Sequence, residues 1–561
     1  MKFTSIALAL GFSLLGSTIN AVAADQPVSG GSLTVGVETE PTTFNPQLNG
    51  QDKAEITLRN FWESLLARRP DGSFVPWLAQ SYEASQDGKV IRFNLRQDVT
   101  FSNGEKFDAN AVADNFRQTQ VAQYCAGTSL CLMGSHIEKI ETPDDHTVVI
   151  TLKEVYSPFL SFAAGLQILA PASWKSPQLK SGGKDLAGTG PFILESYEKG
   201  QQVTYVKNPK YNWAPATAQH QGPAYLDRVT YRFLPESSVR TGALLSGQVD
   251  AIEGISGNDA GEFKDNPDFI YQHALNTGTP YSLFLNVEYG PTQDVKVRQA
   301  LLQGLDIDPL LKSVYRGERT RAWGITSPID PLYNKELEGK YGNNPDAANT
   351  LLDEAGWKTR DGEGFRTKDG QRLRIELIQA QATVRDQRDV LLQAIQAQAR
   401  QRLGVDLKLN YVDSGTYADV RKSGKFGTIA NSNTPTDGVD IENHYRPIAQ
   451  GGAINYSRVN DEKINGLLDK AASTLDLKQR RDFYSQLQQV ALPQLALAVP
   501  LYEPEDQLAT ASYVHGYGFR SYKQMPESVS PASFAAINAN MLSFTDTADP
   551  GEGQWIKVRS I

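Results

Sequence analysis

Histidines and cysteines are the side chains most able to do chemistry, and this 561-residue chain uses few of them. Its six histidines stand at positions 136, 146, 220, 273, 444 and 515, and none forms a spaced metal pair. The phosphate loop Gly-x-x-x-x-Gly-Lys-Ser/Thr, the pair His-Glu-x-x-His and the esterase elbow Gly-x-Ser-x-Gly are all absent. A hydrolase can assemble its site from distant residues, so these absences favour a binding protein and leave a secreted hydrolase as a remote alternative.

Cys125 and Cys131 are the only cysteines, and they flank the short segment Ala-Gly-Thr-Ser-Leu. In an oxidising compartment such a pair forms a disulfide that closes one small loop. His136 follows five residues later, but a Cys/Cys/His set lacks the fourth ligand of a zinc site. We therefore predict a disulfide between these cysteines, no metal site and no cofactor.

The first 24 residues predict where the protein works. Lys2 gives a basic start, residues 6–15 are mostly apolar, and residues 21–24 (Ala-Val-Ala-Ala) supply the small side chains of a cleavage site. The apolar run is too short to span a bilayer, so the segment is typical of a cleaved secretory signal. No cysteine follows it, which argues against a lipid anchor. We expect a protein of the periplasm.

Size, composition and charge narrow the classes of function. A chain of 561 residues predicts two or three folding units, and 40% hydrophobic with 21% charged residues is typical of globular proteins. Removal of the signal takes away one base, Lys2, and no acid, so the net charge changes from −9 to −10. This balance disfavours nucleic acid, whose binding requires basic patches. We expect no nucleic-acid partner and a monomer.

Hydrophobic periodicity predicts a layered α/β protein. Strands that alternate with helices favour this class, and Asp108 has the side chain of a helix N-cap. No low-complexity linker interrupts the chain, so we expect it to cross between its lobes more than once. The predicted strands are 30–37, 90–95, 148–152, 192–194, 203–206, 231–233, 283–287, 373–379 and 405–411, and the predicted helices follow Asp108 and cover 239–245, 295–305, 345–355 and 387–403.

Residues 79–109 carry the most specific pattern of the chain. A strand that ends in Leu-Arg-Gln-Asp-Val (95–99) is followed by Phe-Ser-Asn-Gly (101–104) and a turn into a helix. This run resembles the signature of the peptide/nickel class of bacterial extracellular solute-binding proteins, with Thr100 as the one departure. Other segments resemble the same family across nearly the whole mature chain; they include 30–33, 40–43, 188–192, 208–211, 243–250, 297–301, 355–357, 455–457 and 500–502.

The resemblance implies an α/β fold of two lobes that close around a ligand like a hinged trap, which is the periplasmic-binding-protein fold. The first lobe would carry an extra subdomain, and the hinge would lie at chain crossings near residues 280 and 500. Closure would remove water from the charges of the ligand and create the surface that an importer binds. By this analogy lobe I comprises residues 30–65, 188–280 and 500–561, the extra subdomain 66–187, and lobe II 281–499.

The resemblance also implies ligand contacts. Peptide-binding relatives carry an Asp three residues before another acid, where it pairs with the α-ammonium of the peptide, and Asp437 with Asp440 keeps this spacing. Those relatives have Trp three residues before the Asp, whereas this sequence has Thr434. Arg385 and Arg388 precede a helix where dipeptide-binding relatives place an Arg for the ligand carboxylate. Asp437 could instead cap the helix that starts near residue 441 or lie in a turn, and the two arginines could belong to a solvated helix start.

Residues near strand ends and aromatic residues add further candidates. Glu38 and residues 42–43, both Thr, follow a predicted strand end, where α/β proteins place ligand contacts. Thr43, Trp323 and Tyr445 could wall the pocket, although aromatic residues more often belong to a core. His444 beside Tyr445 raises the alternative of a bound metal chelate.

These observations predict the periplasmic substrate-binding subunit of an ABC importer, not an enzyme. Its ligand would be a di- or oligopeptide-like zwitterion, which it would deliver to a membrane permease. A metal chelate or an opine-like conjugate is the alternative ligand. A chaperone-like binder of unfolded chains is a further alternative, because a roomy peptide site tolerates many side chains.

Overall fold

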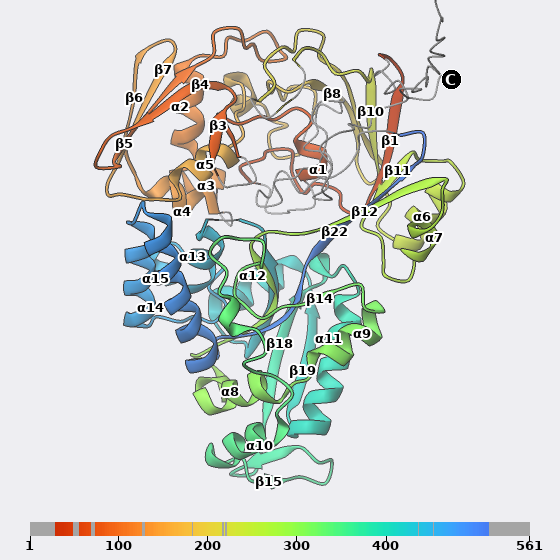
Figure 1. Cartoon of the computed structure of the whole chain (residues 1–561), viewed down its shortest axis with the longest axis vertical. Helices are drawn as coiled ribbons and strands as arrows, with labels where there is room; N and C mark the ends of the chain where they lie inside the picture. Colours follow the sequence, from red (N-terminus) through yellow and green to blue (C-terminus); the bar gives the residue numbers. More distant parts are fainter. Residues whose placement is uncertain are drawn as a thin grey trace, which may run out of the picture.

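The computed structural model describes residues 29–514 except 49–54, 69–72, 126–128, 182, 216–217, 219–220, 436 and 453. The predicted signal segment 1–24 lies outside the described residues. Two lobes lie one above the other in Figure 1, and strands β12 (Phe269–Leu275) and β22 (Glu505–Ala511) run where they meet. The mixed helices and sheets confirm the predicted α/β two-lobe class.

Lobe I, the upper part of Figure 1, is built on a seven-stranded sheet. Its β1 is parallel to both β10 and β11, so the carboxyl ends of these three strands meet at one edge. The strand order is β12, β22, β11 (Ala251–Glu253), β1 (Ser32–Val37), β10 (Arg228–Phe233), β9 (Gln202–Lys207) and β8 (Phe192–Glu198); its helices are α1 (Glu55–Leu58), α6 (Ser237–Leu245) and α7 (Gly261–Lys264).

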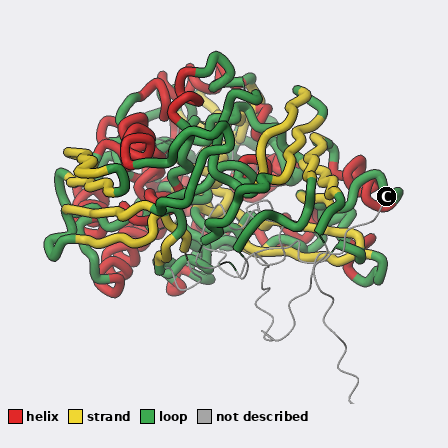
Figure 2. Tube along the Cα trace, turned by 90° about the horizontal axis from the view of Figure 1, so that it is seen from above, coloured by secondary structure: helices red, strands yellow, loops and turns green. Residues whose placement is uncertain are grey.

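A second, four-stranded antiparallel sheet lies beside the first in the upper part of the molecule. Seen from above, the strands gather in separate groups with loops between them (Figure 2). Within this part the disulfide predicted from the sequence joins Cys125 to Cys131. The sheet has the order β4 (Ala79–Ala84), β5 (Val90–Leu95), β7 (Thr147–Leu152) and β6 (Ile137–Asp144), with β2 (Leu66–Arg68) pairing β3 (Phe74–Pro76) nearby and helices α2 (Ala109–Gln118), α3 (Ala122–Cys125), α4 (Ser129–Ser135) and α5 (Phe159–Gly165).

Lobe II, the lower part of Figure 1, is built on a six-stranded sheet. Every residue of its strand β13 is buried, as expected for a strand covered on both faces. The order is β14 (Thr320–Arg321), β21 (Ala498–Glu503), β13 (Thr279–Leu285), β20 (Thr428–Asn433), β18 (Arg374–Ala380) and β19 (Asp406–Val412), and a small sheet of β15 (Thr359–Arg360), β16 (Arg366–Lys368) and β17 (Gln371–Arg372) lies apart.

The helices of lobe II cover this sheet and bury one large hydrophobic core against it. α11 continues at its C-terminal end into a π-helical turn at residues 399–403. The predicted helix 387–403 is therefore an α-helix followed by a π-helical turn. The helices are α8 (Val295–Gly304), α9 (Ile307–Tyr315), α10 (Pro345–Glu354), α11 (Arg388–Gln398), α12 (Ser414–Ser423), α13 (Val439–Tyr445), α14 (Glu462–Ala472) and α15 (Leu477–Gln489).

The chain passes between the two large sheets through two short segments. Residues 276–278 lead from β12 of lobe I to β13 of lobe II, and Pro504 leads from β21 back to β22. Thr277 Oγ1 donates to the carbonyl of Thr434 at 2.8 Å, so the first segment is bonded to the loop that follows β20. The division into lobes and subdomain at the residue numbers expected from the sequence stays a proposal.

Candidate functional site

A cavity of about 670 Å³ lies between the two lobes. Its lobe I wall is made by residues 38–40, 235–238 and 254–259, which directly follow β1, β10 and β11. Since these three strands are parallel neighbours, their following loops converge at one edge of the sheet, which is where open α/β sheets bind ligands. Glu38, which the sequence placed at a strand end, lines the cavity as expected.

The lobe II wall is made mainly by residues 382–389, which follow β18 and lead into α11. Asp386 and Gln387 have φ values of 52° and 53°, a left-handed conformation that is uncommon outside glycine. These two residues turn the chain sharply into the helix, and Arg385 lines the cavity just before the turn. Backbone strain of this kind is frequent at ligand-binding loops.

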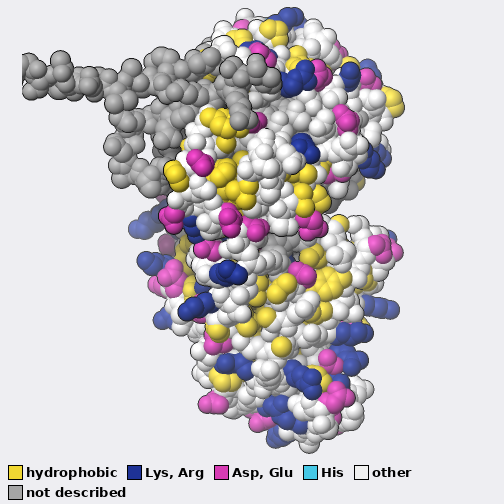
Figure 3. All heavy atoms as spheres, turned by 90° about the vertical axis from the view of Figure 1, so that its right-hand side faces the viewer, with side chains coloured by type: hydrophobic (Ala, Val, Ile, Leu, Met, Phe, Trp, Pro, Cys, Tyr) yellow, Lys and Arg dark blue, Asp and Glu magenta, His cyan; other side chains and the backbone are white. Residues whose placement is uncertain are grey.

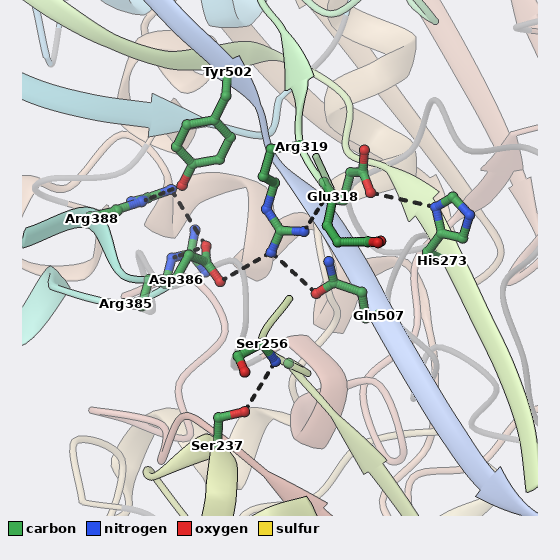
Figure 4. Close-up of polar contacts among 12 residues, drawn as sticks. Ser237, Ser256, His273, Glu318, Arg319, Arg385, Asp386, Arg388, Tyr502 and Gln507 are labelled. Atoms are coloured by element: carbon green, nitrogen blue, oxygen red, sulfur yellow. Dashed lines mark hydrogen bonds and ion pairs between the residues drawn. The ribbon is translucent and has the colours of Figure 1, made fainter. Parts of the chain in front are cut away.

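Three arginines surround the carboxylate of Asp386, and each comes from a different place in lobe II (Figure 4). Arg319, Arg385 and Arg388 approach it at 4.0, 3.9 and 4.0 Å. Burial lowers the pKa of Arg319, but nearby Asp386 and Tyr502 outweigh this effect, so its pKa is raised and the guanidinium stays charged. Three guanidinium groups against one carboxylate give this cluster a net positive charge, and two of them, Arg319 and Arg385, line the cavity and suit an anionic group.

Arg388 lies behind this wall. Its Nε donates to the hydroxyl of Tyr502 at 3.0 Å, and its Nη2 donates to Ser432 Oγ at 2.9 Å. The guanidinium also lies over the ring of Tyr281, 4.1 Å from the ring centre. Arg388 is therefore buried beneath Asp386, whereas Arg385 and Arg319 line the cavity itself.

The lobe I wall is mostly acidic. Glu38, Glu40, Glu236 and Asp259 line it, together with the buried Arg240, which donates to four backbone carbonyl groups and holds the loops after β10 and β11. Asp389 adds a further acid on the lobe II side. In Figure 3 acidic side chains gather along the edge of the upper lobe, and basic side chains lie on the lower lobe beneath them. Four acids and one arginine thus line the cavity on lobe I, whereas two arginines and two aspartates line it on lobe II, so lobe I is the more negative wall.

Asp437 lies on a neighbouring loop of the same sheet edge. β18 and β20 are parallel neighbours, so the loops that carry Arg385 and Asp437 leave lobe II side by side. The carboxylate of Asp437 accepts a hydrogen bond from Ser161 Oγ at 2.7 Å and forms an ion pair with Arg480 Nη2 at 2.7 Å, and the same Nη2 donates to the backbone carbonyl of Asp437 at 2.8 Å. Ser161 belongs to α5 of the upper part, so Asp437 joins the two halves of the molecule.

Asp440, the second acid of the predicted pair, is fully buried in α13. Burial and the nearby charge of Asp330 raise its pKa well above the ordinary value. Its two carboxyl oxygens have no hydrogen-bond partner among the described residues. A raised pKa of this kind favours the protonated, neutral form of the Asp440 carboxyl.

Asp437 is not among the residues that line this cavity, and neither are four other residues expected at the site. Thr434 contributes its carbonyl to Thr277, and Thr43 Oγ1 accepts from the backbone of Asn45 at 3.0 Å. Trp323 packs against lobe II with Arg321 over its ring at 4.5 Å, and Tyr445 is fully buried in the lobe II core. The structure does not bring these four together with Arg385. Their role as ligand contacts stays a prediction.

The sequence did not single out Arg319 or Arg240. Arg240 stands three residues into the helix that follows β10, and a search for residues just after parallel strands would have found its neighbourhood. Arg319 follows α9 in a short connection to β14, where no motif marks it. Its contact with Asp386 joins residues 67 positions apart, so only the fold reveals it.

Two features are absent from the described residues. Among them, no helix is both long and apolar enough to cross a membrane. Nor do the described residues contain a group of three or more His, Cys, Asp or Glu side chains placed to hold a metal ion.

Comparison with known proteins gives consistent similarities. The family model described as "Bacterial extracellular solute-binding proteins, family 5 Middle" matches residues 73–455. The chain is 31% identical to the nickel-binding periplasmic protein of Escherichia coli over 378 residues, or 66% of this chain and 69% of that protein. It is 26% identical to the dipeptide-binding protein of the same organism over 517 residues, or 86% and 90%. The structure of NikA from Brucella suis in complex with Fe(III)-EDTA matches with a TM-score of 0.74 at 26% identity, covering 89% of this chain and 99% of that chain.

Proposed function

This chain belongs to the bacterial extracellular solute-binding proteins of family 5, which serve ABC importers, and we propose that it captures a di- or oligopeptide-like zwitterion between its two lobes. The observation that carries this proposal is the difference in charge across the cavity, whose lobe I wall is acidic and whose lobe II wall presents two arginines. Arg385 and Arg319 on lobe II suit a ligand carboxylate. Glu38 and Glu236 on lobe I suit a cationic group.

The size and position of the cavity support a small ligand. A volume of about 670 Å³ lies within the range of roughly 300–1,000 Å³ that is usual for small-molecule sites. Both lobes contribute to the wall, so a bound zwitterion would contact both and favour the closed form. Closure removes water, which strengthens each contact between ligand and protein charges.

Asp437, which lies outside the lining of the cavity, is our proposed contact for the α-ammonium of the ligand, and Glu38 and Glu236 would then face a cationic side chain. Its carboxylate accepts a hydrogen bond from Ser161 and pairs with Arg480, and a carboxylate has about four lone-pair sites, so capacity remains. Asp437→Ala is expected to abolish peptide binding. Ser161→Ala removes only the hydrogen bond from α5 and serves as the matched control. Normal peptide affinity in Asp437→Ala would contradict this contact.

The proposal also includes the cellular location of the protein and its membrane partner. The family and its periplasmic relatives support a periplasmic protein that delivers its ligand to an ABC permease. We propose that residues 1–24 are cleaved on export, that no lipid anchor is attached, and that the mature protein is a monomer. Relatives that are binding proteins rather than enzymes support release of the ligand unchanged.

An anionic metal chelate is the second candidate ligand. The 31% identical relative is a nickel-binding periplasmic protein. The arginines around Asp386 would suit an anionic chelate as well as a carboxylate. An opine-like conjugate, which also carries carboxylates, shares this chemistry.

Calorimetry on the mature chain, unfolded and refolded to remove any co-purified ligand, tests the proposal. The probes are a panel of di-, tri- and tetraalanine, the C-terminal amides of these peptides, Ni(II) with histidine, and an opine. The expected result is binding of at least one free-acid peptide, recovered intact by mass spectrometry. Binding of the chelate or opine without any peptide would overturn the peptide assignment, and cleavage of the peptide would overturn the assignment as a binding protein.

A further inference from the structure

Arg319 is a charged side chain built into the wall of the cavity. Its side chain is only 2% exposed, and it lines the cavity together with Arg385. The ring of Tyr315 lies 5.4 Å from its guanidinium carbon, and Nη1 donates to the carbonyl of Glu318 at 3.1 Å. These contacts hold the guanidinium in one orientation, so little conformational entropy remains to be lost when a ligand binds.

The hydrogen-bonding capacity of Arg319 is not exhausted by these neighbours. Its buried Nε has no hydrogen-bond partner among the described residues. The pair with Asp386 measures 4.0 Å, which is longer than a charge-assisted hydrogen bond of about 2.7–2.9 Å. A buried guanidinium that keeps a donor unsatisfied is costly unless an acceptor arrives. Figure 4 shows this group between Asp386 and Gln507, on the side that faces Ser256.

Arg319 also connects lobe II to lobe I. Its Nη2 donates to Gln507 Oε1 at 3.4 Å, and Gln507 belongs to β22 of the lobe I sheet. With the Gln507 amide rotated, its oxygen accepts from both Nη atoms of Arg319 and its nitrogen donates to the carbonyl of Ile255 at 3.1 Å. Ile255 itself lines the cavity. The guanidinium is therefore linked to both walls.

The two residues beside Arg319 make contacts of the same kind. Glu318 accepts from Lys264 Nζ of α7 at 2.5 Å, and Thr320 Oγ1 donates to Glu505 Oε1 of β22 at 3.3 Å. Residues 318–320 thus make three consecutive contacts between the lobes. Arg319 is the middle residue, and it also lines the cavity.

We propose that Arg319 is the second guanidinium of the ligand's carboxylate site: it binds the same carboxylate as Arg385 and ties it, through Gln507, to lobe I. This inference rests on the proposed function and deepens it. It assigns the carboxylate end of the ligand to the part of the cavity nearest the chain crossings. A ligand with a free carboxylate then favours closure more than a neutral analogue does.

The experiment compares the free-acid and amide forms of each peptide in the alanine panel by calorimetry. The ratio of their dissociation constants is measured for the natural protein, Arg319→Gln, Arg319→Lys, Arg385→Gln and the double variant Arg319→Gln/Arg385→Gln. We expect Arg319→Gln to weaken binding of the acid at least about 30-fold and of the amide less than threefold, because only the acid loses a charged partner. The double variant should lose less than the two single losses combined, since both arginines bind one group.

One added variant, Arg374→Gln, and the Arg319→Lys variant named above keep the experiment decisive. Arg374→Gln removes an exposed arginine that pairs with Asp406 on the far edge of the sheet, and it should leave both dissociation constants within twofold. Arg319→Lys keeps the charge of a buried position, so it remains informative if Arg319→Gln does not fold. It should lower the acid-to-amide preference in part, because lysine lacks the fork of arginine.

The outcomes separate the two proposals. A preference for the acid that collapses in the Arg319 variants supports the inference. A preference that survives in Arg319→Gln, or in Arg319→Lys should the former not fold, overturns it while the proposed function stands. If the natural protein binds none of the free-acid peptides, both proposals fail together.

Discussion

At the scale of single residues, His444 shows how burial sets charge in lobe II. Its imidazole is fully buried and stacks on Phe284 with 4.4 Å between ring centres. Nδ1 lies 2.9 Å from the carbonyl oxygen of Asp440, so Nδ1 carries the proton and donates it. Burial lowers the pKa of His444 to about 4. The residue is therefore a neutral part of the lobe II core at neutral pH.

His444 should make stability depend on pH in a defined direction. The unfolded chain takes up a proton near the ordinary pKa of about 6.5, whereas the folded protein does so only near 4, so stability is lost as pH falls between these values. Linkage predicts a loss of about 2 kcal/mol between pH 7.5 and pH 5 from this residue. Urea unfolding of the natural protein and His444→Gln at both pH values measures it. Equal pH dependence in the two proteins would refute the prediction.

Some site residues could be predicted from sequence and others could not. Arg385 was reached through the family resemblance and Glu38 through its position after a strand, and both line the cavity. Arg480, which pairs with Asp437, is 43 residues away on α15. Such a pairing depends on how α15 packs against the loop after β20, which no local pattern encodes. Arg319 escaped prediction for the same reason.

At the scale of elements, local rules predicted most strands and helices well. The strand 90–95 matches β5, and Asp108 caps α2 by accepting from the backbone nitrogen of Ala111 at 2.9 Å. Alternation and capping are encoded within a few residues, so they can be read directly. The strand expected at 283–287 begins four residues earlier, at Thr279, because its first residues are buried by partners on both sides. Sheet order could not be predicted, since β22 and β12 are far apart in sequence.

The Asp108 cap gives a test at this scale. Asp108→Ala removes the acceptor for the first turn of α2, and the free energy of unfolding should fall by about 1 kcal/mol. Asp108→Ser keeps a capping oxygen and should recover most of this loss. Chemical unfolding monitored by circular dichroism measures both variants. Equal stability of the Ala and Ser variants would show that the cap contributes nothing.

The disulfide between Cys125 and Cys131 gives a second test. It closes a loop with a sequence separation of 6, and the chain-entropy model predicts a stabilisation of about 2 kcal/mol. The double variant Cys125→Ser/Cys131→Ser should lose this amount in urea unfolding. Neither cysteine lines the cavity, so ligand affinity should stay within about twofold. A reducing agent should destabilise the natural protein and leave the double variant unchanged.

At the scale of the whole molecule, the two short crossings determine how the lobes can move. Residues 276–278 and Pro504 are the segments that join the two large sheets. Gly278 has a φ of 79° and packs closely against the loop after β20; a Cβ there would lie 2.2 Å from the carbonyl oxygen of Asn433. The first crossing is therefore in direct contact with the loop that carries Asp437.

Gly278→Ala should disturb lobe closure more than backbone strain at this position alone would. The added methyl group must push the loop at residues 433–435 away, so we expect ligand affinity to fall at least about tenfold. Gly247→Ala is the matched control, because Gly247 has a similar φ of 71° and open space around its Cβ position. Both variants share the cost of a left-handed alanine, of order 1 kcal/mol. Small-angle scattering with and without ligand would show closure only in the control, and closure in both would contradict the prediction.

The position of β22 in the lobe I sheet determines when each lobe can finish folding. This applies to a chain that emerges from a translocation channel with its N-terminus first. In the described sheet, β12 pairs only with β22, and β22 follows all of lobe II in the sequence. The first lobe to be delivered therefore cannot finish its sheet until the second has been delivered as well. Such a chain stays incompletely folded while it is threaded, and it completes both lobes together only after the last described strand has passed through.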